Sequence, residues 1–345
     1  MNVLLTSVGR RAYMVKYFKE VLGAEGQVHV CNSDNKSIAF KYADKKVISP
    51  LIYDENYIPF LVEYCKENSI DIIISLFDID LLILARHKKE FEEIGTNVIV
   101  SNEGIIEICN DKWQTYEFLT KNCFNTPKSF LKIKEVIKKI KEGNLSYPVV
   151  VKPRYGCGSI SVSIAHDEED LIYLTKKANQ EINDSYLKYE SAASDEKIVY
   201  QECLIGQEYG ADIINNLKGE VQNVIVRKKI AMRSGETDIA ELVDEPIIRD
   251  ELGRLGIITK HIANMDCDVF LVNGKPYILE LNARFGGGYP FSHMGGCNLP
   301  QAIVNWVKGE KVDRDTLLSR TGVIGFKEIF ISELDTNERR NVSAP

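Results

Sequence analysis

The stretch LELNARFGGG, residues 279–288, places an acid, an amide and a guanidinium at every second position and then ends in three glycines. Side chains alternate between the two faces of a strand, so Glu280, Asn282 and Arg284 would share one face. The apolar residues between them would share the opposite face and pack against a core. The stretch therefore predicts a strand with one chemically active face, followed by a turn in which the backbone is accessible.

The stretch just before it, DVFLVNG, begins at Asp268 and is joined to it by a very short turn. The two stretches would form an antiparallel hairpin. If the loop has three residues, 273–275, then Asp268 lies directly opposite Glu280 and their Cβ atoms are about 5 Å apart. A two-residue loop, 273–274, would place the two acids on opposite faces of the hairpin. The paired arrangement is the register that we predict.

Two carboxylates side by side are costly unless a cation lies between them. The candidate ligand atoms here are oxygens, without sulfur or imidazole, which favours Mg²⁺, an ion that usually also takes phosphate oxygens. Arg284 would then bind phosphate or another anion beside the metal. A solvated strand face with an ordinary salt bridge is the alternative interpretation.

The bulk composition is that of a soluble globular protein. The chain has 345 residues, 44% hydrophobic and 27% charged, which suits two or three modest domains. The net charge of −7 and the dispersed basic residues do not favour a nucleic-acid partner. The amino-terminal apolar run lacks a preceding basic region, and no run reaches the roughly 18 apolar residues of a membrane helix. Eight scattered cysteines, none in a CxxC pair, indicate reduced thiols in the cytoplasm.

The first 100 residues alternate between stretches typical of strands and of helices. The expected strands are 2–6, 28–32, 71–76 and 97–100, and the expected helices are 10–22, 56–68 and 80–94. This alternation predicts a parallel sheet with helices on its faces. Ligands bind beyond the carboxyl ends of such strands, here TSVGRR, CNSDN and SLFDID. After Pro148, short strands joined by hairpin turns, with helices at about 167–182 and 246–264, predict an α+β region.

A glycine turn lies in PVVVKPRYGCGSISV, residues 148–162. A strand carrying Lys152 and Arg154 leads into the turn, where backbone N–H groups can approach phosphate closely. The stretch has neither the GxxxxGK[ST] pattern of a P-loop nor the Rossmann fingerprint. A plain hairpin turn is the alternative interpretation.

A short linker lies between two strands in VYQECLIGQEYGADI, residues 199–213. The backbone of such a linker can bind adenine through its N–H and C=O groups. Glu202 and Glu208 bracket the linker, and a carboxylate accepts hydrogen bonds from an amino group or from ribose hydroxyls. By itself this segment indicates nucleotide binding only weakly.

The order of these segments resembles the ATP-grasp superfamily, and most closely its single-module proteins similar to half of a carbamoyl-phosphate synthase large subunit. The resemblance rests mainly on VVKPxxGxGS and ELNxRxGGG at their mutual spacing and covers residues 1–330. It implies a Rossmann-like pre-ATP-grasp domain at 1–110, an ATP-grasp small lobe at 111–205 and a large lobe with the metal site at 206–330. A polar tail at 331–345 would follow. ATP would lie between the two α+β lobes.

The resemblance also implies a role for individual residues. The implied ATP-binding residues are Lys112, Lys152, Arg154, Gly156, Gly158, Ser159, Glu202, Cys203, Leu204 and Glu208. The lysines would contact the phosphates, the backbone near Leu204 and Glu202 would bind adenine, and Glu208 would bind the ribose. The implied ligands of one or two Mg²⁺ ions, which Mn²⁺ could replace, are Asp268, Glu280 and Asn282. Carbamoyl-phosphate synthases more often carry glutamine at the position of Asp268, and an acid there adds negative charge for metal.

The acceptor site is expected beside the glycine turn. In proteins of this type the turn after the metal strand, here Gly287 and Gly288, lies beside the acceptor, and a turn rich in N–H groups suits a carboxylate. The stretch VRKKIAMRSGETD supplies basic residues on or near a strand. Either Arg227 or Arg233 would bind the activated carboxylate, with a solvated basic strand as the alternative.

A second group of substrate residues is expected at the carboxyl ends of the first strands. SVGRR opens the first helix, and a helix N-terminus with Arg10 and Arg11 is an anion site, which suits a second carboxylate. In LFDIDL, Asp78 or Asp80 could hold a substrate ammonium, although capping of the helix is the competing interpretation. We take Asp78 as the candidate.

The chemistry implied by the resemblance is the activation of a small-molecule carboxylate, such as an amino acid, as an acylphosphate, followed by attack of an amine. Lys152, Arg284, Mg²⁺ and one of the two strand arginines would supply the positioning and charge neutralisation that phosphoryl transfer needs. The alternatives are an enzyme acting on bicarbonate, an ATP-grasp kinase or a ligase with a non-amine acceptor, and a nucleotide-binding regulatory protein. A homodimer is expected.

Overall fold

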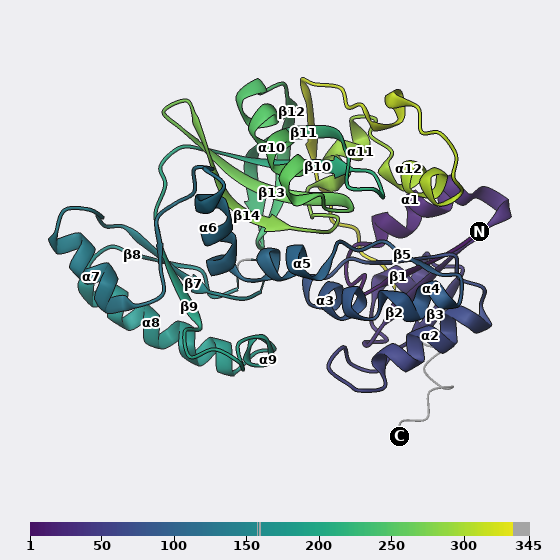
Figure 1. The fold of residues 1–345 in the computed structure, drawn as a ribbon, viewed down its shortest axis with the longest axis horizontal. Helices are drawn as coiled ribbons and strands as arrows, with labels where there is room; N and C mark the ends of the chain where they lie inside the picture. Colours follow the sequence, from purple (N-terminus) through teal and green to yellow (C-terminus); the bar gives the residue numbers. More distant parts are fainter. Residues whose placement is uncertain (157, 159, 334–345) are drawn as a thin grey trace.

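A computed structural model describes residues 1–156, 158 and 160–333 of the chain (Figure 1). An N-terminal parallel sheet with helices is followed by a small lobe and then by a large lobe, each built on an antiparallel sheet. This order confirms the predicted N-terminal α/β domain followed by a two-lobed α+β domain. Among the described residues, none of the helices combines the length and the apolar character that crossing a bilayer requires.

The N-terminal domain is a five-stranded parallel sheet in the order β3-β2-β1-β4-β5. The central strand β1 pairs with β2 on one side and β4 on the other, and its residues from Val3 to Thr6 are buried. Such continuous burial is expected of strands that helices cover on both faces. The strands are β1 (Asn2–Thr6), β2 (Gln27–Asn32), β3 (Lys45–Ile48), β4 (Ile72–Ser75) and β5 (Asn97–Val98). The helices are α1 (Ala12–Leu22), α2 (Tyr57–Glu67), α3 (Asp78–Arg86) and α4 (Lys88–Glu93), with 3-10 turns at Gly23–Glu25 and Ile38–Lys41.

The predicted single helix over 80–94 is wrong, because the chain forms the two helices α3 and α4. It leaves helical geometry at His87, where φ is −103° and ψ is 10°. Residues 86–90 are all polar, so no apolar face holds a continuous helix against the core at this point. Of the six residues of α4, only Phe91 is buried.

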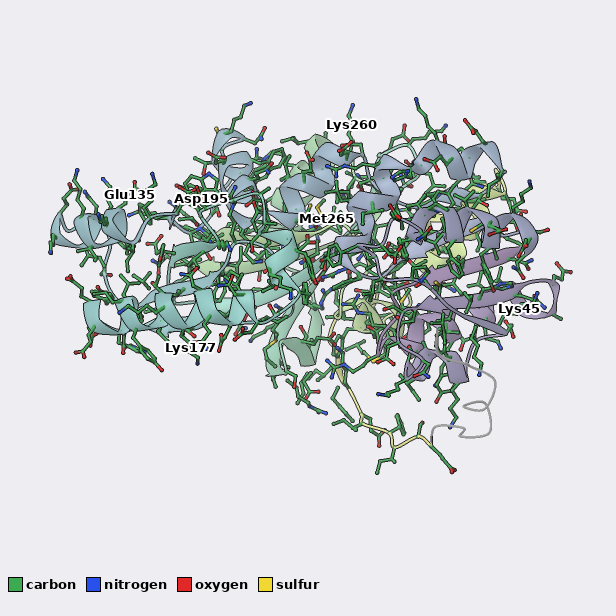
Figure 2. All side chains as sticks on the ribbon, turned by 90° about the horizontal axis from the view of Figure 1, so that it is seen from below. Lys45, Glu135, Lys177, Asp195, Lys260 and Met265 are labelled. Carbon is green, nitrogen blue, oxygen red and sulfur yellow. The ribbon has the colours of Figure 1, made fainter. Side chains whose placement is uncertain are left out.

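The small lobe is a four-stranded antiparallel sheet in the order β6-β9-β7-β8, with its helices beside it. In Figure 2 the small lobe, marked by Glu135 and Lys177, lies at the opposite end of the molecule from Lys45 of the N-terminal domain. The hydroxyl of Tyr53, in the N-terminal domain, donates a hydrogen bond to Glu190 of the lobe at 2.7 Å. The strands are β6 (Ser129–Phe130), β7 (Val149–Pro153), β8 (Ser163–Ala165) and β9 (Ile198–Glu202), and the helices are α7 (Ile133–Lys141), α8 (Glu168–Asn183) and α9 (Leu187–Glu190).

The large lobe is a six-stranded antiparallel sheet in the order β14-β13-β10-β11-β12-β15. The helix expected over 246–264 ends at Thr259, because Lys260 takes a left-handed conformation with φ 47° and the chain then enters β13. The strands are β10 (Gln207–Asn215), β11 (Val221–Arg233), β12 (Glu236–Val243), β13 (Ala263–Val272), β14 (Lys275–Asn282) and β15 (Val323–Phe326). Its helices are α10 (Pro246–Thr259), α11 (Tyr289–Met294) and α12 (Leu299–Val307), with a 3-10 turn at Arg314–Leu317. Two helices that precede the small lobe in the chain, α5 (Glu103–Asn110) and α6 (Lys112–Lys121), also contact β14.

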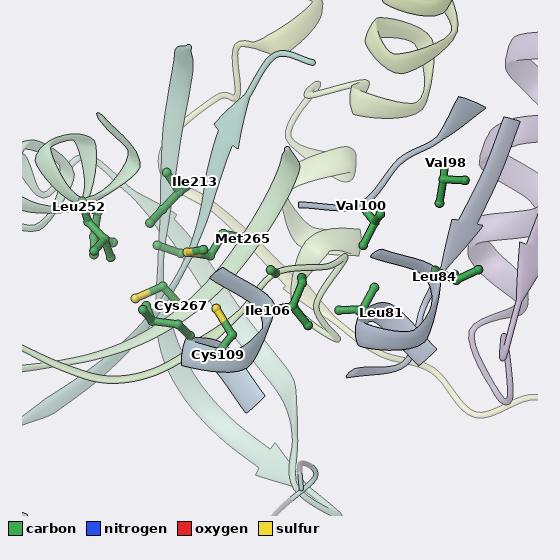
Figure 3. Close-up of a cluster of buried hydrophobic side chains, with 14 of the residues drawn as sticks. Leu81, Leu84, Val98, Val100, Ile106, Cys109, Ile213, Leu252, Met265 and Cys267 are labelled. Atoms are coloured by element: carbon green, nitrogen blue, oxygen red, sulfur yellow. The ribbon is translucent and has the colours of Figure 1, made fainter. Parts of the chain in front are cut away.

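Hydrophobic cores connect the N-terminal domain to the large lobe, whereas the small lobe has its own core. One core joins side chains of the N-terminal domain, such as Leu81 and Val98, to Ile213 and Met265 of the large sheet (Figure 3). A second core also spans these two parts, and α12 of the large lobe packs against α1. The small lobe has a core of its own, formed by buried residues between Val136 and Tyr200. The N-terminal domain and the large lobe therefore share their interior, whereas the small lobe is packed separately.

Candidate active site

The pairing of Asp268 with Glu280 across β13 and β14 is confirmed, although the predicted loop length is wrong. The hairpin turn has two residues, Asn273 and Gly274, both with positive φ, as a tight hairpin turn requires. With such a turn alone, Asp268 would face Leu279. A β-bulge shifts the register by one residue and brings Glu280 opposite Asp268.

The bulge also moves Leu279 away from the core face where strand alternation would place it. Leu281 and Ala283 are buried as expected, with exposed fractions of 0% and 5%, but Leu279 is half-buried and lines a cavity. The next pair along the hairpin joins Asn282 to Asp266. One face of β13 and β14 thus carries three acids and an amide side by side.

Two neighbouring cavities lie along this face. The larger, of about 440 Å³, is lined by both lobes and contains most of the predicted ATP-binding residues. These are Lys112, Lys152, Gly156, Glu202, Cys203, Leu204 and Glu208. The smaller, of about 120 Å³, is lined from the N-terminal domain, the glycine turn and the large sheet. The cavities share Met232, Gly235, Asp268 and Glu280, so the paired acids stand at their junction.

The two predicted phosphate lysines reach the larger cavity from different elements. Lys152, on β7, is 5% exposed and donates a hydrogen bond to Gln201 at 2.8 Å. Burial lowers the pKa of Lys152 to about 8, because a low-dielectric site disfavours the charged form. Lys112, the first residue of α6, donates to the carbonyl oxygen of Gly156 in the glycine turn. An anion between these two lysines would meet two ammonium groups.

The remaining residues of the glycine-turn segment are placed differently. Gly158 lines the smaller cavity, and Ser159 lies outside the described residues. Arg154, predicted to bind ATP, lines neither cavity described above. It donates to both carboxylate oxygens of Asp111, at 2.7 and 2.6 Å, and to Ser194. Arg154 therefore fastens the base of the turn to the start of α6.

Arg284 and Asp78 form a buried ion pair that joins the metal strand to the N-terminal domain. The guanidinium donates to one oxygen of Asp78 from Nε at 3.1 Å and from Nη2 at 2.9 Å. It also lies 3.6 Å from Asp266. Asp78 was predicted to hold a substrate ammonium, but in the structure it forms an ion pair with Arg284. It does not act as the side-chain cap of α3 either, since it is the first residue of that helix and Phe77 stands before it.

Arg227 extends this network of alternating charges along the same face of the large sheet. It is 1% exposed and binds Asp212 at 2.6 Å and Asp266 at 2.5 Å. A Cβ atom at Gly288 would collide with its guanidinium, and a Cβ at Gly286 would collide with Asp266. Gly286 and Gly288 therefore leave room for buried charges of the protein itself, and Gly288 also lines the smaller cavity.

The alternative strand arginine, Arg233, is not brought to the site. Alternation from Arg227 predicts that both arginines face the same way, but β11 has register shifts on either side of Ala231. Met232 faces the two cavities instead. Arg233 is 44% exposed and pairs with Asp238 at 2.6 Å.

Lys229 is a functional candidate that the sequence reasoning missed. Its ammonium lies 2.7 Å from Glu208, the predicted ribose ligand, and 2.7 Å from Asp268, a predicted metal ligand. Burial, followed by the charge of Asp266 and also that of Glu280, raises the pKa of Asp268 to about 6, against the opposing charge of Lys229. Strand alternation from Arg227 was the available signal, since Lys229 follows two positions later on the same face.

The donor set suits a hard divalent cation. Within the described residues, histidine, cysteine, aspartate and glutamate side chains form no ready-made cluster of three for a metal. Two opposed carboxylates with the buried amide of Asn282 leave positions for oxygen atoms of a bound phosphate, which is how Mg²⁺ is usually held. Burial and the charges of Asp266 and Glu280 raise the pKa of Asp268, so a cation bound beside it would favour its ionised form.

Comparisons with known proteins agree with this geometry. The family model of the ATP-grasp domain matches residues 109–288, and that of the PylC-like N-terminal domain matches residues 3–99. The carbamoyl phosphate synthase large chain of Clostridium botulinum (strain Loch Maree / Type A3) is 24% identical over 294 residues, which are 81% of this chain and 25% of that protein. That of Neisseria meningitidis serogroup B (strain ATCC BAA-335 / MC58) is 22% identical over 270 residues, which are 76% of this chain and 24% of that protein. The chain spans about a quarter of the length of these relatives.

Solved structures show the same fold at low sequence identity. The biotin carboxylase domain of Hydrogenobacter thermophilus 2-oxoglutarate carboxylase, solved with MgADP, ADP and bicarbonate, has a TM-score of 0.72 and 19% identity. The match covers 94% of this chain and 73% of that one. The L-amino acid ligase from Bacillus licheniformis has a TM-score of 0.62 and 20% identity, with coverage of 89% and 74%.

Proposed function

The chain belongs to the ATP-grasp family, whose domain model matches more than half of its 345 residues, and on this premise we propose that it is an ADP-forming ligase that joins a small-molecule carboxylate to an amine. The acid would be activated by ATP as an acylphosphate, and the amine would displace phosphate to give an amide. An amino acid or a related acid is the substrate that we favour.

The observation that carries this proposal is the placement of Asp268 and Glu280 at the junction of the two cavities. The larger cavity has the volume and the cations for a nucleotide, and the smaller one extends the same acidic face toward the N-terminal domain. A phosphoryl group held at the junction would stand between nucleotide and acceptor. Transfer from one cavity to the other therefore needs no large displacement of the bound groups.

Residues of both lobes would hold the ATP substrate and its metal. Lys112 and Lys152 would bind phosphate oxygens, and the linker after β9 would bind the adenine. Asp268, Glu280 and Asn282 would hold Mg²⁺. When bound, the ion neutralises charge on the phosphates and aligns them.

The proposed reaction has two displacements. A carboxylate oxygen of the acid attacks the γ-phosphorus of ATP, the bond from that phosphorus to the β-phosphate oxygen breaks, and ADP leaves. The amine nitrogen then attacks the acyl carbon, the carbon–oxygen bond to phosphate breaks, and the nitrogen loses a proton. Arg284 would stabilise the negative charge on the transferred phosphoryl group, and Lys152 would steady it from the opposite lobe.

Bicarbonate as the activated acid is a second candidate. It is favoured by the carbamoyl phosphate synthase relatives and by the fold shared with a biotin carboxylase domain solved with bicarbonate. The chain spans only about a quarter of those synthases, so their full activity does not transfer to it. A bicarbonate-dependent release of ADP, with no requirement for an organic acid, would select this alternative.

The test is release of ADP and phosphate from Mg·ATP across a matrix of carboxylic acids and amines, singly and in pairs, with bicarbonate wells beside them. A ligase requires one acid and one amine and gives a product mass equal to their sum less water. A mass gain of one phosphoryl group would instead identify a kinase. ATP binding without turnover in any well would favour a regulatory protein.

Glu280→Gln is the variant that tests the metal site. It keeps the shape of the side chain but removes a charge from the proposed Mg²⁺ ligands, so turnover should be abolished while the circular dichroism spectrum stays unchanged. The matched control is Glu241→Gln, on β12 of the same sheet and outside both cavities, which should retain turnover. Normal turnover by Glu280→Gln would refute the metal assignment. The homodimer and the cytoplasmic location stay predictions, and sedimentation velocity would test the first.

A further inference from the structure

The smaller cavity carries four cationic and four acidic side chains in its lining. The cations are Arg11, Arg227, Lys229 and Arg284, and the acids are Glu236, Asp266, Asp268 and Glu280. Three of the cations form ion pairs with buried or half-buried acids of the protein. The exception is Arg11, whose Nη1 donates to the backbone carbonyls of Leu76 and Phe285. Its positive charge is thus held in place by neutral groups.

Among the acids, Glu236 is the one whose ion-pair partner, Lys327, lies outside the cavity lining. Asp266 and Asp268 are ion-paired within the network, and Glu280 faces Asp268 in the proposed metal site. Glu236, the first residue of β12, instead lies against the glycine turn, where a Cβ at Gly287 would stand 3.0 Å from its carboxyl carbon. Its side chain is therefore outside the metal strands but inside the cavity.

Within the described part of the chain, only one oxygen of Glu236 accepts a hydrogen bond. Oε2 accepts a hydrogen bond from Lys327 at 2.8 Å, and Lys327 is not part of the cavity lining. Burial alone would raise the pKa of Glu236, but the hydrogen bond from Lys327 and the charges of Lys327, Arg11 and Arg10 bring it below its usual value. The carboxylate is thus ionised and close to Arg11.

We propose that Arg11 and Glu236 form the binding site for the charged end of an amino acid, with Glu236 accepting hydrogen bonds from its ammonium and Arg11 donating to its carboxylate. This inference rests on the proposed ligase function and names the class of one of its substrates. A simple carboxylic acid would leave Glu236 facing another negative charge, and a simple amine would face Arg11. A molecule that carries both charges satisfies both residues.

The proposed site differs from the one expected from sequence alone. Asp78 was the candidate for the ammonium, but it is paired with Arg284. Glu236 has an oxygen free for a ligand, and the cavity volume of about 120 Å³ suits a small polar group rather than a second nucleotide. The role of Arg11 is retained.

The test compares the two partners of the Glu236–Lys327 ion pair. ADP release from Mg·ATP is measured with a mixture of the twenty protein amino acids as the probe, and the half-saturating concentration of the mixture is determined. Glu236→Gln should raise it about tenfold to a hundredfold, because a charge-assisted hydrogen bond is lost. Lys327→Met should lower it, because a competing ammonium is removed from Glu236. Glu241→Gln, on the same strand β12 but outside both cavities, is the control and should leave it unchanged.

A merely structural role for the ion pair predicts a different pattern. If Glu236 only anchors the segment that follows β15 and carries Lys327, the two variants change the half-saturating concentration in the same direction or not at all, and the proposal is overturned. It is also overturned if acetate or propionate supports ADP release with ethylamine as well as the amino-acid mixture does.

Failure of the ligase function would look different. The wild-type protein would then bind Mg·ATP but release no ADP in any mixture. Stabilisation by the amino-acid mixture, measured as a rise in Tm, still tests the site without turnover. Loss of that rise in Glu236→Gln but not in Glu241→Gln would support the site, and an equal rise in both would overturn it.

Discussion

Replacing Asp78 with asparagine removes a charge from the buried pair between α3 and the metal strand. The pair is well enclosed, since the side chains of Arg284 and Asp78 are 5% and 11% exposed. It links residues 206 positions apart in the chain, at the seam between the N-terminal domain and the large lobe. The substitution keeps the size of the side chain, so packing is conserved and the change is electrostatic.

The expected cost follows from the geometry of the pair. Removing one partner of a buried ion pair typically costs about 3–5 kcal/mol, because the other charge stays buried. Arg284 keeps Asp266 at 3.6 Å, and the amide oxygen of asparagine still accepts a hydrogen bond, which is worth about 1 kcal/mol. We therefore expect the free energy of unfolding to fall by about 2–3 kcal/mol, a large share of the stability of an ordinary protein.

Urea denaturation of a double-mutant cycle measures this effect. Asp78→Asn, Arg284→Gln and the double variant should show a coupling energy of at least about 1 kcal/mol. Asp44→Asn, which breaks the half-exposed pair with Lys19 in the same domain, is the control and should cost below about 1 kcal/mol.

Two results would refute the reasoning on Asp78. The first is additivity of the single effects within about 0.5 kcal/mol, which would mean that the two side chains do not interact in solution. The second is unchanged stability together with a weaker affinity for the amine substrate. That outcome would restore the role expected from sequence, in which Asp78 binds the ammonium directly.

Further predictions concern the charged face and its glycine turn. The pKa of Asp268 is raised to about 6 in the folded protein, so the fold favours the protonated carboxyl. This contribution to stability is present below the unfolded pKa of about 4 and is lost as pH rises through 6. Mg²⁺ binds the ionised carboxylate and should therefore raise Tm more above about pH 7 than below about pH 5. Lys152→Met should raise the Kd for ATP at least about tenfold by calorimetry, with little change in stability, because the buried ammonium is costly to the fold. Gly288→Ala should cost about 1–3 kcal/mol in urea denaturation, because its methyl group would collide with Arg227, whereas Gly253→Ala, in the open on α10, should be neutral or stabilising.

Local sequence patterns predicted the elements of the site better than their register. Alternation correctly placed Glu280 and Asn282 on one face, since that property needs only a strand. The pairing of Asp268 with Glu280 was correct for the wrong reason, because the two-residue turn and the bulge shift the register in compensating ways. A bulge depends on how a whole sheet packs, and a single strand does not reveal it. The same kind of irregularity in β11 moved Arg233 out of the site.

Contacts between distant segments could not be read from local patterns. The pairing of Asp78 with Arg284 and the contact of Lys327 with Glu236 join residues 206 and 91 positions apart. Each charge had several candidate partners in the sequence, and only the folded arrangement of the lobes selects one. The helix break at His87 was also missed, because helix propensity there is ordinary and the break reflects a lack of apolar contacts.

The self-contained core of the small lobe bears on the energetics of admitting substrates. A rotation of this lobe away from the rest would leave both shared cores intact, so its free-energy cost is set by the contacts outside those cores. Those toward the N-terminal domain include the Tyr53–Glu190 hydrogen bond, the rings of Tyr53 and Tyr189 at 4.8 Å, and the rings of Phe77 and Tyr186 at 6.0 Å. Contacts of these kinds contribute on the order of 1 kcal/mol each. Nucleotide binding releases more free energy than that, so under the proposed function the arrival of ATP would itself close the lobe and shield the proposed acylphosphate from hydrolysis.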